Sequence, residues 1–119
     1  MNFLLINRAA DSMYSLLYDG QYRNTSLGRD TWKTIIGLKA SLQMNCNMEG
    51  FKARCFWRYN SRVRIGFAAN NQDDCWTCDS RIGFRSDGLP DDSNTCGHAA
   101  QNGDNGNKNI KAMCYLFVH

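Results

Sequence analysis

The stretch from residue 61 to residue 96, SRVRIGFAANNQDDCWTCDSRIGFRSDGLPDDSNTC, contains one pattern twice. Arg64-Ile65-Gly66-Phe67 and Arg81-Ile82-Gly83-Phe84 are both short runs of strand-forming residues. Each run is followed by a loop rich in Asp and Asn that ends at a cysteine, first Cys75 and then Cys96. Clusters of Asp, Asn and Gly form loops with defined turn geometry. The repeat therefore predicts two strand–loop units whose loops lie side by side.

Length and composition favour one globular domain. The chain has 119 residues, of which 43% are hydrophobic, and a net charge of +3. This length suits a single modest core, and the composition is neither that of a disordered chain nor that of a membrane span. The small charge does not indicate nucleic acid, whose protein partners usually carry a clustered basic stripe. We expect one extracellular domain over residues 1–119, with no nucleic-acid partner and no membrane insertion.

The six cysteines favour disulfides, because an even number in a small chain rich in Gly and Asn is typical of secreted domains. Cys75-Trp76-Thr77-Cys78 is a CxxC motif and leaves two alternatives open. Zinc would need a second ligand pair, for which Cys96 and His98 are poor candidates. A redox site would need the motif to open a helix after a strand. We therefore predict disulfides of unspecified pairing and a secreted protein in an oxidising compartment.

Short apolar and β-branched runs recur along the chain with little helical periodicity. Strands are expected over residues 3–6, 32–38, 42–45, 51–59, 63–68, 80–84 and 110–118, and a hairpin over residues 9–22 around Asp19-Gly20. Residues 85–108 are expected to form a long polar connection held by disulfides or ions. The last run is expected to be a central strand. Trp32 and Trp57 are expected to lie in the core, and the alternative for each is a platform for a sugar ring. The predicted fold is all-β, a single-domain disulfide-stapled β-sandwich or roll with long polar loops.

Several of these motifs resemble a small secreted cysteine-containing domain of cnidarians. They are the runs LQMNCNMEGF at 42–51, RIG with NNQDDC at 64–75, DSRIGF at 79–84 and IKAMCYLFV at 110–118. That domain occurs in extracellular and skeletal-matrix proteins, and the chain is also similar to the galactose-binding lectins of sea anemones. The resemblance covers most of the chain from Trp32 onward. It implies an extracellular domain that binds galactose-type glycans.

The residue types in the two loops suit sugar recognition. Carboxylates and amides exchange hydrogen bonds with hydroxyl groups, and an aromatic ring packs against the apolar face of a sugar. Disulfides in these loops would limit the entropy lost on binding. The alternative for the Asp and Asn side chains is turn capping. The predicted carbohydrate-binding residues are Asn70, Asn71, Asp73, Asp74, Trp76, Asp91, Asp92 and Asn94.

Calcium is a second expectation, since closely spaced oxygen ligands suit Ca²⁺. The predicted metal ligands are Asp87, Asp92, Asn102, Asp104 and Asn107, although neither segment has the EF-hand spacing. A solvated loop is the alternative. Sugar recognition itself requires no cofactor, and Ca²⁺ is the ion expected to order the long connection.

The sequence does not favour an enzyme. It holds two histidines, His98 and His119, without the Ser, His and Asp order of a hydrolase triad. Adjacent carboxylates such as Asp73 and Asp74 would face opposite sides of a strand, which does not suit glycoside hydrolysis. We therefore predict a secreted lectin-like domain that binds glycans or glycoproteins without chemistry, with homo-oligomers strengthening weak single sites. The alternative is a structural or adhesive extracellular-matrix module that binds calcium or partner proteins without sugar specificity.

Overall fold

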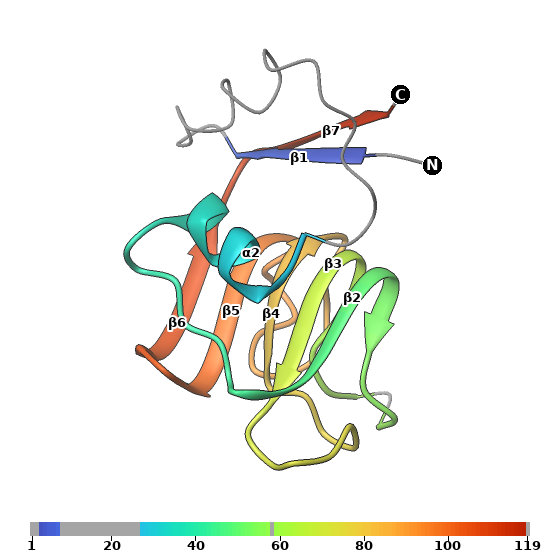
Figure 1. Ribbon diagram of the computed structural model, residues 1–119, viewed down its shortest axis with the longest axis vertical. Coiled ribbons are helices and arrows are strands. Elements are labelled where there is room, and N and C mark those ends of the chain that lie inside the picture. The colour runs from blue at the N-terminus through green and yellow to red at the C-terminus, as the bar shows by residue number, and fades with distance from the viewer. Residues whose placement is uncertain (1–2, 8–26, 58, 119) are drawn as a thin grey trace.

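An antiparallel sheet forms the body of the protein in the computed structural model, which describes residues 3–7, 27–57 and 59–118 (Figure 1). Each of its five strands pairs with the next along the chain. The strands are β2 (Asn45–Arg54), β3 (Arg62–Asn70), β4 (Ser80–Phe84), β5 (Cys96–Gly103) and β6 (Gly106–Lys111). A separate antiparallel pair joins β1 (Phe3–Asn7) to β7 (Cys114–Val118). The all-β prediction is confirmed, and the hairpin predicted over residues 9–22 lies outside the described residues.

The strand predicted over residues 32–38 is wrong, because this segment forms the helix α2 (Arg29–Ile36). Trp32 and Ile35 lie three residues apart, so a helix buries both on one face, and both are buried against the sheet. Glycines with positive φ stand on either side of the helix, Gly28 at 88° and Gly37 at 101°. Burial of that face outweighs the strand preference of the β-branched residues.

The second half of the chain also departs from the prediction. The expected polar connection over residues 85–108 contains all of β5 and the start of β6. The expected strand over residues 110–118 is interrupted between Lys111 and Cys114, and its second half pairs with β1 rather than standing at the centre of the main sheet. The expected strand at 42–45 is also wrong: residues 41–43 are buried but belong to no strand, and β2 begins only at Asn45. The expected strand at 51–59 is right only as far as Arg54, where β2 ends.

The main core lies between α2 and one face of the sheet. Its buried members are Trp32, Ile35, Leu42, Phe67, Ala69 and Ile82. Trp32 is fully buried, as predicted, and its indole nitrogen donates to the carboxylate of Glu49. A smaller cluster of Cys55, Ala68 and Cys78 is also buried. Because Ala68 lies between Phe67 and Ala69 on β3, strand alternation places this cluster on the opposite face of the sheet.

Four glycines form a row across four neighbouring strands. Gly66 pairs with Gly50 on one side and with Gly83 on the other, and Gly83 pairs with Gly97. All four have positive φ, from 110° at Gly50 to 156° at Gly66 and Gly83. A Cβ on Gly66 would lie 2.1 Å from the carbonyl oxygen of Ile82. At Gly66, Gly83 and Gly97 the backbones therefore approach more closely than any side chain permits, whereas a Cβ on Gly50 would meet nothing within 4 Å.

Strand β2 is strongly curved. Cys46 and Cys55 lie nine residues apart, which would place them about 30 Å apart on a straight strand, yet their sulfur atoms are 3.6 Å apart. A register shift between Asn45 and Met48 and the positive φ of Gly50 and Lys52 accompany the bend. The curvature lets both ends of β2 reach the loop that follows β3.

All six cysteines form disulfides: Cys46–Cys75, Cys55–Cys78 and Cys96–Cys114. This pairing confirms the predicted disulfide framework and indicates an oxidising environment. Cys75 and Cys78 bond to different partners, so the CxxC motif is not a redox pair. The sulfurs of Cys46, Cys55 and Cys78 lie within 4.8 Å of one another, but each is already in a disulfide and is no zinc ligand.

Candidate functional site

The loop between β3 and β4 is shaped by its own polar side chains. The amide nitrogen of Asn70, which is buried, donates to the carbonyl oxygen of Asp74 over 2.9 Å and to its carboxylate over 3.0 Å. The same carboxylate accepts from the backbone N–H of Trp76 over 2.8 Å. Asn70 and Asp74 therefore cap the turn, which was the alternative to sugar binding. Asn71 and Asp73 are exposed.

Trp76 stacks on Phe56, a residue that sequence reasoning assigned to a strand. Their ring centroids are 4.8 Å apart and the rings are 10° from parallel. The backbone N–H groups of Phe56 and Trp57 donate to the carbonyls of Cys75 and Trp76, each over 2.8 Å. Phe56 is 77% exposed and Trp76 is 50% exposed. Ring surface therefore remains open to solvent although each ring contacts the other.

A second exposed aromatic pair follows directly in the sequence. Trp57 and Tyr59 have ring centroids 6.2 Å apart. The prediction that Trp57 lies in the core is wrong, since the side chain is 48% exposed. Strand β2 has ended at Arg54, so no alternation turns this ring inward. We call Phe56, Trp57, Tyr59 and Trp76 the aromatic surface.

Two disulfides fix this surface to the sheet. Cys75 precedes Trp76 and bonds to Cys46 at the start of β2, while Cys55 precedes Phe56 and bonds to Cys78. The stacked rings are thus each adjacent to a bridged cysteine. Such a site loses little chain entropy on binding. In the sequence, Cys55 precedes Phe56 as Cys75 precedes Trp76, and this parallel is the signal that could have identified Phe56.

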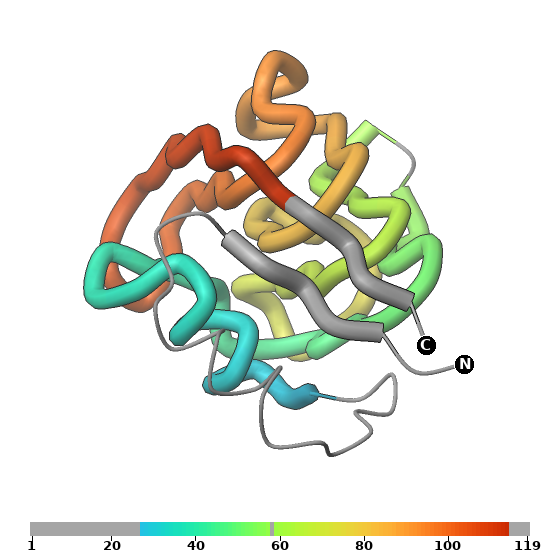
Figure 2. The backbone as a smooth tube through the Cα atoms, turned by 90° about the horizontal axis from the view of Figure 1, so that it is seen from above, coloured from blue at the N-terminus to red at the C-terminus, as the bar shows by residue number. Residues whose placement is uncertain are grey.

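The two acidic loops reach the segment 59–61 by different routes. The loops leave β4 at opposite ends, because β3, β4 and β5 are antiparallel neighbours. Residues 85–95 then fold back over the sheet on the side away from α2 (Figure 2). Both loops contact residues 59–61: the N–H of Ser61 donates to the carbonyl of Cys78 over 2.8 Å, and the N–H of Leu89 donates to the carbonyl of Tyr59 over 3.1 Å. Within the described residues, no hydrogen bond or ion pair joins residues 70–76 directly to residues 91–94, so a single sugar site built from both loops stays a prediction.

The predicted sugar ligands of the second loop hold that loop together. Asp91 accepts from the N–H and hydroxyl of Ser93, over 2.8 and 2.7 Å, and these hydrogen bonds lower the pKa of its carboxyl group. Asp92 accepts from the N–H of Gly88 over 2.6 Å. Asn94 is buried and donates to the carbonyl of His98 over 2.8 Å. These three residues are therefore primarily structural.

A buried arginine anchors this loop. Arg81, on β4, is fully buried and donates to the carbonyls of Gly88, Leu89 and Asp91 and to the hydroxyl of Ser61. Burial lowers the pKa of its guanidinium, and the charges of the aspartates in the loop act in the opposite direction. Arg64, at the same position of the first repeat, is exposed. The two repeats thus use their arginines differently.

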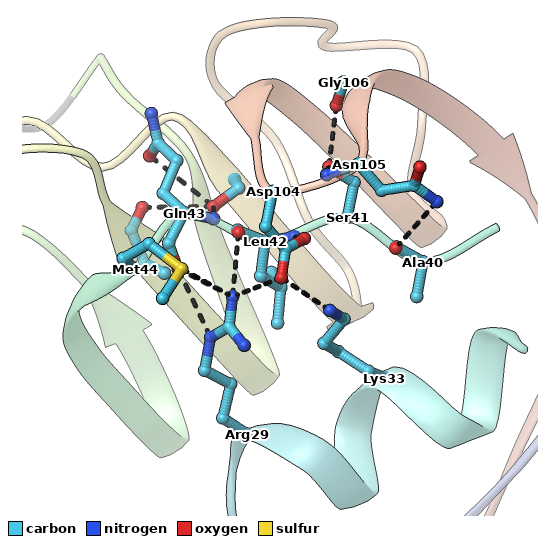
Figure 3. A network of polar contacts seen from close by, with 12 residues as sticks. Arg29, Lys33, Ala40, Ser41, Leu42, Gln43, Met44, Asp104, Asn105 and Gly106 are labelled. Atoms are coloured by element: carbon cyan, nitrogen blue, oxygen red, sulfur yellow. Dashed lines mark hydrogen bonds and ion pairs between the residues drawn. The ribbon is translucent and has the colours of Figure 1, made fainter. Parts of the chain in front are cut away.

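The predicted calcium ligands do not form one site. Asp87 is ion-paired with Arg62, whereas Asn102, Asp104 and Asn107 lie at the turn between β5 and β6. Figure 3 shows Asp104 between Arg29 and Lys33, with its oxygen 2.9 and 2.6 Å from their nitrogens. Partial desolvation raises the pKa of Asp104, but hydrogen bonds from Lys33 and Arg29 outweigh it and lower the pKa to about 2. The carboxylates of Asp87 and Asp104 are already ion-paired with protein cations, so the predicted residues fit calcium poorly.

His98 is a structural residue. Its ring is buried, its Nε2 accepts from the N–H of Ser41 over 2.9 Å, and its Nδ1 lies 2.8 Å from the carbonyl of Arg81. This arrangement requires the neutral ring with a proton on Nδ1. Burial lowers the pKa of His98 to about 4. The ring therefore ties the segment before β2 to the centre of the sheet.

The pKa of His98 predicts a loss of stability in mild acid. Because the unfolded chain takes up the proton near the ordinary pKa of 6.5, the contribution of the neutral ring is fully present above that pH and declines as the pH falls toward 4. The free energy of unfolding should fall by about 2 kcal/mol between pH 7 and pH 5. Urea denaturation at both pH values measures the change. His98→Gln should remove most of this dependence of stability on pH. If the variant keeps the full dependence, other groups cause it.

The comparisons with known proteins give no relative: no family model, curated protein or solved structure matches the chain. The resemblance to cnidarian domains therefore stays a prediction from sequence motifs. In the described part of the chain, no helix has both the length and the apolar character needed to cross a membrane.

Proposed function

We propose that the protein is a secreted carbohydrate-binding domain that recognises galactose-type glycans or glycoproteins through the aromatic surface and the adjoining 71–76 loop. The observation that carries the proposal is the exposed Phe56–Trp76 stack, held by two disulfides. Solvent exposure of aromatic rings at disulfide-fixed positions costs hydration free energy and is typical of binding surfaces. The apolar face of galactose is a suitable partner for such rings.

Hydrogen-bonding groups adjoin the rings. Asn71 and Asp73 are exposed, and within the described residues neither side chain has a hydrogen-bond partner. They are available to sugar hydroxyls, whereas Asn70 and Asp74 are engaged in the turn. The proposed mechanism is recognition without a chemical step or a required cofactor. Homo-oligomers would strengthen weak single sites.

A glycan array tests this function. The oxidised protein should bind terminal-galactose glycans equally in calcium and in EDTA. Trp76→Ala should weaken binding about tenfold or more, the scale of losing a central aromatic contact, with little change in thermal unfolding. Asp74→Ala would disturb the turn as well, so Asp73→Ala is the better polar variant. Loss of binding in EDTA would instead support the predicted calcium dependence.

A blank array for the folded protein would contradict the proposal. The remaining candidate would then be the extracellular-matrix module that binds partner proteins without sugar specificity. The matched control is Leu38→Ala, which removes a fully exposed apolar side chain outside the aromatic surface. Equal losses from Leu38→Ala and Trp76→Ala would show that binding is non-specific.

A further inference from the structure

A groove with a strong positive charge is lined by none of the residues of the aromatic surface. It has a volume of about 580 Å³ and is lined by Lys52, Arg54, Arg62, Val63, Arg64, Arg85 and Asp87. Five of the chain's 14 Lys and Arg residues line it, against one of its 11 Asp and Glu residues. The groove therefore concentrates a basic excess that the whole-chain charge of +3 does not reveal.

The sheet register explains how the cations converge. Arg54 pairs directly with Arg62 across β2 and β3. Lys52 lies across from Arg64, because the residues on either side of Lys52 pair with Ile65 and Val63. Arg85 follows Phe84, which pairs with Ile65, so Arg85 adjoins Arg64 from the other side. Like charges placed opposite one another across strands destabilise a sheet.

Few protein anions balance this charge. Arg62 is ion-paired with Asp87. Throughout the part of the chain that the structure describes, no carboxylate forms an ion pair with Lys52, Arg54, Arg64 or Arg85. Among the described residues, these four cations thus line the groove without an acidic partner. Unbalanced charge in a groove attracts ligands of the opposite sign.

The backbone at both sides of Arg64 is strained. Lys52 has φ of 55° and Arg85 has φ of 47°, in the left-handed region that non-glycine residues rarely occupy. Backbone strain of this kind is energetically unfavourable and concentrates at functional sites. Here the backbone strain accompanies the electrostatic repulsion between neighbouring cations. A bound anion would offset both, because it would neutralise the cations that this backbone brings together.

We infer that this groove binds an extended polysaccharide that carries sulfate groups. Neighbouring strands are about 5 Å apart and alternate residues about 7 Å apart, so the cations match several anionic groups along a chain rather than one ion. Arginine donates two parallel hydrogen bonds to such oxyanions. Unpaired nucleic acid would need rings for base stacking, and none of the described residues that line the groove is aromatic.

A fluorescein-labelled heparin hexasaccharide tests the inference by anisotropy at low and moderate salt. The oxidised protein should bind it, and affinity should fall as salt rises. Arg64→Gln with Arg85→Gln should weaken binding at least tenfold. Lys39→Gln, which removes an exposed cation outside the groove, should change affinity by less than twofold. Trp76→Ala should leave heparin binding unchanged, which separates this site from the proposed galactose site.

Thermal unfolding supplies a second readout. The double variant should be at least as stable as the natural chain, because it removes repulsion between neighbouring cations. No binding at 50 mM salt would overturn the inference, as would equal losses from the groove and Lys39 variants. Equal affinity for chemically desulfated heparin, or tighter binding to a single-stranded DNA of similar charge, would also overturn it.

Discussion

Replacing Gly66 by alanine should lower the free energy of unfolding by about 4 kcal/mol. The added Cβ would lie 2.1 Å from the carbonyl oxygen of Ile82 and 2.8 Å from the Cα of Gly83. Both neighbours are backbone atoms of β4, so relief requires that two paired strands move apart. The φ of 156° adds backbone strain for any other residue. Urea denaturation with intact disulfides measures the effect.

Gly50 provides a matched control in the same row of glycines. Its φ is 110°, and an added Cβ would meet nothing within 4 Å. Gly50→Ala should therefore cost about 1 kcal/mol, from backbone strain alone. If the two variants lost equal stability, close approach of the strands would not be the reason for glycine at position 66.

Arg81→Met should destabilise the fold by about 3 kcal/mol. The variant keeps much of the side-chain volume but removes the donors to the carbonyls of Gly88, Leu89 and Asp91. Those carbonyls belong to the loop that folds back over the sheet, so the loop should loosen as well. Urea denaturation gives the first effect, and hydrogen exchange of residues 86–94 gives the second.

Arg64→Met is the control, since Arg64 occupies the same position of the RIGF repeat but is exposed. It should leave the free energy of unfolding within about 0.5 kcal/mol of its original value. A comparable loss in both variants would mean that general charge, and not the buried contacts of Arg81, supports the loop.

The strands that carry the repeat could be predicted because their local pattern and their tertiary setting agree. β4 matches its predicted bounds and β3 extends its predicted run by a few residues at the ends. The prediction for residues 32–38 failed because Thr34, Ile35 and Ile36 favour a strand locally, while contacts with sheet residues far along the sequence favour the helix. The spacing of Trp32 and Ile35 was the local sign of the helix, and the run of β-branched residues outweighed it in the prediction.

The candidate site was predictable only in part. Trp76 could be identified because an aromatic residue between two cysteines is unusual in a polar loop. Asn70 and Asn94 could not be distinguished from Asn71, since the sequence does not show which amide is buried. Phe56 and Trp57 were assigned to a strand because an apolar run does not show that β2 ends at Arg54, although the neighbours Cys55 and Phe56 parallel Cys75 and Trp76. The cations of the groove converge only through the strand register.

The most direct test of sugar recognition follows the three tryptophan indole N–H signals by NMR during titration with methyl β-galactoside. The indole of Trp32 is fully buried and hydrogen-bonded to Glu49, so its N–H signal is an internal reference. Saturable shifts of the Trp76 signal, with the Trp32 signal unchanged, are the predicted result. If no indole signal moves up to high millimolar sugar, or if all three move together without saturation, the aromatic surface is not a galactose site.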